Sequence, residues 1–120
     1  MTENRQSKQY DLEERTLKFS REVLEFTSGL KQSIANVEVI KQLIRSACSV
    51  GANYIEANES LSKKDFANRS KICRKEAKES RYWLNLIQSN GDESEKKRLA
   101  LIQEATELTR IFGAIVEKTK

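Results

Sequence analysis

The chain has 120 residues, of which 33% are charged and 38% are hydrophobic, and its formal net charge at pH 7 is +4. It has no proline, four glycines and no histidine, so it lacks the turn residues of a many-stranded β domain and the commonest general base and zinc ligand. No apolar run approaches the roughly 18 residues of a transmembrane helix, and the start of the chain does not resemble a signal peptide. We therefore expect a cytoplasmic protein that makes no contact with a membrane.

Residues 1–10 are polar without periodicity, and we expect a mobile N-terminal tail there, followed by one helical domain over residues 11–118. Asp11 with Glu14 resembles a helix-capping pair, and Gly29 is typical of a helix end. Between them, mostly apolar residues recur at spacings of three and four, which predicts the buried side of an amphipathic helix. This stripe comprises Leu12, Thr16, Phe19, Val23, Phe26 and Leu30.

Three further segments have the same periodicity. Asn36 is a candidate cap for the second helix, and Ser62 with Asp65 for the third. The fourth begins at Asp92 with Glu95, after a break at Asn90-Gly91. The three stripes comprise Ile40, Leu43, Ile44, Ala47, Val50, Gly51, Tyr54 and Leu61; Phe66, Cys73, Ala77, Leu84 and Ile87; and Leu101, Ala105, Leu108, Phe112 and Ile115.

Four helices with short connections predict an all-α fold, an antiparallel up-down four-helix bundle. The junction at residues 60–63 is the weakest boundary, because the second and third helices could also continue through it with a kink. Cys48 and Cys73 form no CxxC motif, and we expect buried, reduced thiols rather than a redox pair.

The second predicted helix carries a face of short polar side chains, opposite its apolar stripe. Serine and asparagine are poor helix formers, whereas a solvated face usually carries lysine and glutamate. The face could be a second packing surface, a ligand site built on Arg45, Asn53 and Glu56, or an ordinary exposed surface. We favour packing, which in a four-helix chain suggests a homo-oligomer. The expected oligomer interface comprises Gln42, Arg45, Ser46, Ser49, Asn53 and Glu56.

If buried, Arg45 and Glu56 would each need a partner of opposite charge, since an unpaired buried charge is costly. Glu76 and Glu79 of the third predicted helix are the candidate partners of Arg45.

Positive charge is concentrated in the third predicted helix. Residues 62–81 hold eight basic and three acidic side chains, a net charge of +5 against +4 for the whole chain. Such a stripe is typical of a surface that binds phosphates of RNA or DNA, although it could also be a solvated face. The candidate nucleic-acid contacts are Lys64, Lys71, Arg74, Lys75, Lys78 and Arg81.

Aromatic residues do not interleave this stripe, so base stacking is not expected there. Tyr82 and Trp83 follow it, and Trp83 is interpreted as a packing residue. An enzyme is the least favoured class: Glu56, Glu76 and Glu79 could suggest a di-metal carboxylate site, but the Glu-x-x-His pairs of such bundles need histidine. We predict no catalytic residues, no metal and no cofactor.

Two stretches, QLIRSACSVGANYIEANES (42–60) and KKDFANRSKICRKEAKESRYWLNLI (63–87), resemble the bacterial four-helix-bundle family of 23S rRNA intervening-sequence proteins. The likeness extends over about residues 10–118, through LEERTLKFSREV (12–23) and ELTRIFGAIV (107–116). Ala57 departs from the pattern, because glycine often follows the acidic residue there.

The resemblance implies a homopentamer without enzymatic activity, related to the accessory variability protein of diversity-generating retroelements. Our leading hypothesis is an oligomeric protein that binds structured RNA or DNA through the third helix. The alternative is a protein-interaction scaffold, for example for a polymerase or reverse transcriptase, without direct nucleic-acid contact.

Overall fold

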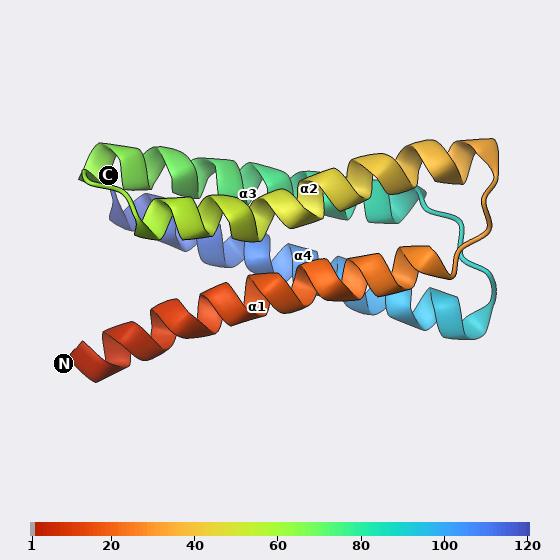
Figure 1. The fold of residues 1–120 in the computed structure, drawn as a ribbon, viewed down its shortest axis with the longest axis horizontal. Helices are drawn as coiled ribbons and strands as arrows, with labels where there is room; N and C mark the ends of the chain where they lie inside the picture. The colour runs from red at the N-terminus through yellow and green to blue at the C-terminus, as the bar shows by residue number, and fades with distance from the viewer. Residues whose placement is uncertain (1) are drawn as a thin grey trace.

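The structure is a computed structural model that describes the backbone of residues 2–120 and the side chains of residues 12–120. It contains four helices: α1 (Thr2–Ser28), α2 (Ile34–Asn58), α3 (Lys63–Leu86) and α4 (Asp92–Lys118). They are joined by loops of four or five residues, and successive helices run in opposite directions (Figure 1). Within the described chain α1 packs on α2 and α4, and α3 packs on the same two helices. The predicted all-α up-down four-helix bundle is thereby confirmed.

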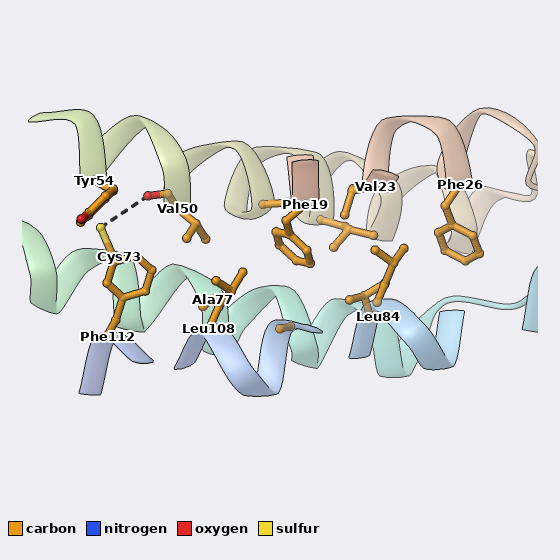
Figure 2. Close-up of a cluster of buried hydrophobic side chains, with 14 of the residues drawn as sticks. Phe19, Val23, Phe26, Val50, Tyr54, Cys73, Ala77, Leu84, Leu108 and Phe112 are labelled. Atoms are coloured by element: carbon orange, nitrogen blue, oxygen red, sulfur yellow. Dashed lines mark hydrogen bonds between the residues drawn. The ribbon is translucent and has the colours of Figure 1, made fainter. Parts of the chain in front are cut away.

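The core follows the predicted apolar stripes. Every stripe residue of the first helix is buried, and so are most of those in the other three. Figure 2 shows the core between the two pairs of helices, with Phe19 and Val23 from α1 and Leu84 from α3 directed toward its centre. The periodicity of the sequence therefore determines which side of each helix faces inward.

Both cysteines are free thiols. Cys73 is fully buried, and its Sγ donates to the carbonyl oxygen of Val50 at 3.4 Å (Figure 2). Burial raises the pKa of this thiol to about 12, so it stays protonated at neutral pH. Cys48 is only half-buried, which differs from the expectation that both would be buried.

Two helix boundaries differ from those expected. Helix α1 begins at Thr2 and runs through Asp11, so Asp11 with Glu14 does not mark its start. The expected mobility of residues 1–10 stays a prediction, because their side chains lie outside the described part. Helix α2 is capped by Ser33, whose Oγ accepts from the backbone N–H of Asn36 at 3.1 Å, so Asn36 itself is not the cap.

The junction between α2 and α3 is a loop rather than a kink. Helix α2 ends at Asn58, and α3 begins after Ser62, whose Oγ accepts from the Asp65 N–H as expected. Leu61 lies in this loop and is 100% exposed, so its assignment to the apolar stripe was wrong. No helix in the described part of the chain is long and apolar enough to cross a membrane.

Candidate nucleic-acid interface

The predicted basic stripe lies along the outer side of α3. The inner side of this helix buries small and apolar residues, among them Cys73, Ala77 and Leu84, against the core. Because that face is fixed inward, the basic residues turn outward: Lys64, Lys71, Lys75 and Lys78 are exposed, while Arg74 and Arg81 are half-buried. The fold therefore holds all six candidate contacts on one helix, and four of them are exposed to solvent.

Four of these six cations line one shallow hollow on the surface. Its lining comprises Lys71, Arg74, Lys75, Lys78, Glu79 and Tyr82. No carboxylate among the described side chains forms an ion pair with any of the four cations. The hollow thus carries a formal net charge of +3, and its cations are available to an anionic ligand.

Glu79 is the one acidic residue of the hollow, and it is drawn toward α2. Its Oε1 lies 3.6 Å from Nη2 of Arg45, while its Oε2 is buried and has no hydrogen-bond partner among the described residues. The pairing with Arg45 partly offsets the charge of Glu79, which leaves the lysines to dominate the potential outside the helix.

Arg45 has the acidic partners that its sequence context suggested. Its guanidinium donates to both carboxylate oxygens of Glu76, at 3.3 and 3.4 Å, and pairs with Glu79 as well. Glu76 is only 7% exposed, so the guanidinium compensates for the burial of its carboxylate. Both glutamates that the sequence offered as partners of Arg45 therefore contact it in the structure.

The small polar face of α2 is divided between the bundle interior and the surface. Ser46 is fully buried, and its hydroxyl lies 2.9 Å from that of Ser80 in α3. Its packing partner is α3 of the same chain, so we correct its assignment to the oligomer interface. Asn53 accepts from Arg69 of α3 at 2.9 Å and is half-buried, as is Ser49.

The remaining members of this face are reachable from outside: Gln42 and Glu56 are exposed, and half of the Arg45 side chain is accessible. Glu56 does not join Glu76 and Glu79. Among the described side chains, no group of three or more histidine, cysteine or acidic residues is placed to hold a metal ion.

Sequence reasoning missed the position of Tyr82. Tyr82 follows the stripe in the sequence, and the structure places it in the lining of the same hollow as the lysines. The signal was its spacing of four, seven and eleven residues from Lys78, Lys75 and Lys71, which places all four on one side of a helix. Trp83, interpreted as a packing residue, does pack against the core.

The fold and this surface define a class of protein: a small up-down helical bundle with one basic helix face. Residues 8–114 match the family of 23S rRNA-intervening sequence proteins. The match covers most of the chain, and the protein belongs to this family.

A solved structure agrees with this assignment. It is the crystal structure of a protein of unknown function from the S23 ribosomal protein family of Bacteroides thetaiotaomicron, which superimposes with a TM-score of 0.77 at 27% sequence identity. The match covers 92% of this chain and 98% of the other. No curated protein matches the sequence.

Proposed function

We propose that this protein is a non-enzymatic, homo-oligomeric binder of structured RNA or DNA, and that the basic face of α3 is its contact surface. The observation that carries the proposal is the hollow in which Lys71, Arg74, Lys75 and Lys78 stand without acidic partners among the described residues. Cations so placed release counterions from a phosphate backbone, which gives affinity and position but no sequence readout.

A homo-oligomer, which we propose to be a pentamer, would make this surface more effective. The exposed part of the α2 face, with Gln42, Arg45 and Glu56, would supply the contact between subunits. Several copies of the stripe in one assembly would add avidity that a single helix lacks. Sedimentation equilibrium of the purified chain measures the number of subunits directly.

The proposal predicts that reversing two charges in the hollow weakens binding and flattens its salt dependence. We would compare the wild type with the double variant Lys75→Glu/Lys78→Glu, measuring fluorescence anisotropy of a labelled RNA stem-loop and a DNA duplex across a salt series. If both lysines contact phosphates, the magnitude of the slope of log K against log salt falls by about 2 for each subunit that contacts the probe. Both side chains are exposed, so the variant should fold normally.

The matched control is Lys96→Glu/Lys97→Glu, which makes the same charge change at two exposed positions of α4. It should keep the wild-type slope, with only a small uniform loss of affinity. Equal behaviour of the two double variants would contradict the proposal. If the wild type binds neither probe at low salt, the alternative of a protein-interaction scaffold replaces it.

A further inference from the structure

Tyr82 is an aromatic side chain on the outside of the bundle. It is 59% exposed, although burying a tyrosine ring is usually favourable. One edge of the ring contacts Trp83, with centroids 5.1 Å apart and planes at 74°. Since Trp83 packs against the core, this contact restrains the Tyr82 ring while much of it stays accessible to a ligand.

The ring lies in line with the lysines of α3. At 100° per residue, Tyr82 is within about 40° of Lys71, Lys75 and Lys78 around the helix axis. Along the axis it is about 6 Å beyond Lys78 and about 11 Å beyond Lys75. The same hollow is lined by all four side chains. A strand whose phosphates rest on the lysines would therefore place a base beside the ring.

We infer that Tyr82 is a stacking platform for an unpaired nucleobase, whose neighbouring phosphates are held by Lys75 and Lys78. The inference rests on the proposed function, because stacking at Tyr82 needs a nucleic acid on the basic stripe. Every base has a π face, but in a continuous duplex that face is covered by its neighbours. The preferred ligand is accordingly a nucleic acid with a loop, bulge or single-stranded segment rather than a fully paired duplex.

The test compares two labelled probes that share one stem: an RNA hairpin with an unpaired loop, and the stem as a blunt duplex. Tyr82→Ala should weaken hairpin binding about 5- to 150-fold, the range for losing one stacked base, and change duplex binding less than about twofold. Tyr82→Phe keeps the ring and should bind the hairpin within about twofold of the wild type. A DNA hairpin of the same sequence separates the two sources of the base: loss on both hairpins, or on RNA alone, supports stacking.

The control for side-chain truncation is Leu86→Ala, one turn further along α3, where Leu86 is 49% exposed and outside the hollow. It should bind both probes like the wild type, and the melting temperatures of Tyr82→Ala and Leu86→Ala should agree. Equal loss on hairpin and duplex, or no loss with Tyr82→Ala, would overturn the inference. If Tyr82→Ala has no effect while the lysine reversal weakens binding, the proposed function stands without the stacking platform. If the wild type binds neither probe, both fail.

Discussion

Gly51 determines how closely α1 and α2 approach. It is buried in α2, and a Cβ added there would lie 3.0 Å from Oγ1 and 3.3 Å from Cβ of Thr16 in α1. Thr16 cannot turn away easily, because it is 1% exposed and its hydroxyl donates to the carbonyl of Leu12 at 2.9 Å. The missing side chain thus permits a helix contact that alanine would widen.

We predict that Gly51→Ala lowers the free energy of unfolding by about 1 kcal/mol. Overpacking costs about 1–3 kcal/mol, and only about 1 kcal/mol is regained from the better helix propensity of alanine. Urea unfolding followed by circular dichroism, at one protein concentration, measures the change.

Gly113→Ala in α4 is the matched control. The nearest atom to its added Cβ is Cδ of Arg74 at 3.8 Å, an ordinary contact, so this variant should gain about 0.5–1 kcal/mol. If the two variants are equally stable, Thr16 does not restrict Gly51 as the structure implies.

At the scale of the elements, Asn36 joins the two loops at one end of the bundle. It is 2% exposed, and its Nδ2 donates to the carbonyls of Lys31 and Gln88, both at 3.1 Å. Its Oδ1 accepts from the backbone N–H of Gln88, also at 3.1 Å. Asn90 adds a second link, donating to the carbonyl of Gly29 at 2.6 Å. The α1–α2 and α3–α4 loops are held together by these side chains.

Replacing Asn36 by alanine should lower the free energy of unfolding by about 2–4 kcal/mol, since three hydrogen bonds of a buried side chain are lost. Asn68→Ala, at an exposed position of α3, is the control and should change stability by less than about 0.5 kcal/mol. Thermal and urea unfolding of both variants measure the difference. A small effect at Asn36 would mean that water replaces its contacts.

Periodicity was sufficient to predict the elements and the core, because burial of an amphipathic face depends on spacing along one helix. The same reasoning failed where a side chain makes hydrogen bonds to a segment that is distant in the sequence. Asn36 resembles a cap locally, but Ser33 occupies that position, and two of the three side-chain hydrogen bonds of Asn36 reach Gln88, 52 residues away.

In the candidate site, too, features that depend on spacing or charge along the sequence could be predicted, and features that depend on contacts between helices could not. The lysine stripe and the pairing of Arg45 with Glu76 could be predicted, since helix geometry and charge balance both favour them. The burial of Ser46 against Ser80 could not be predicted, because serine occurs both in buried contacts between helices and on exposed helix surfaces. The place of Tyr82 could have been found from its spacing, but an aromatic residue at helical spacing is usually a core residue.

At the scale of the whole molecule, the net positive charge of the protein is concentrated on one helix, α3. Residues 62–81 carry +5 of a chain whose total is +4, so the other residues are close to neutral. Between α1 and α4, Arg15 pairs with Glu104 at 2.7 Å and with Glu107 at 2.8 Å beside a groove of about 1250 Å³. Arg15 is thus paired with carboxylates, whereas none of the four cations of the α3 hollow has an ion pair among the described side chains, and this contrast concentrates the field on one face.

The most direct test of the central claim is lysine-modification footprinting of the wild-type protein, alone and saturated with an RNA stem-loop. The ligand should protect Lys71, Lys75 and Lys78 from acetylation, whereas Lys96 and Lys97 of α4, which are also exposed, should react at an unchanged rate. Protection of the α4 lysines instead, or uniform reactivity in the bound state, would contradict the assignment of α3 as the nucleic-acid interface.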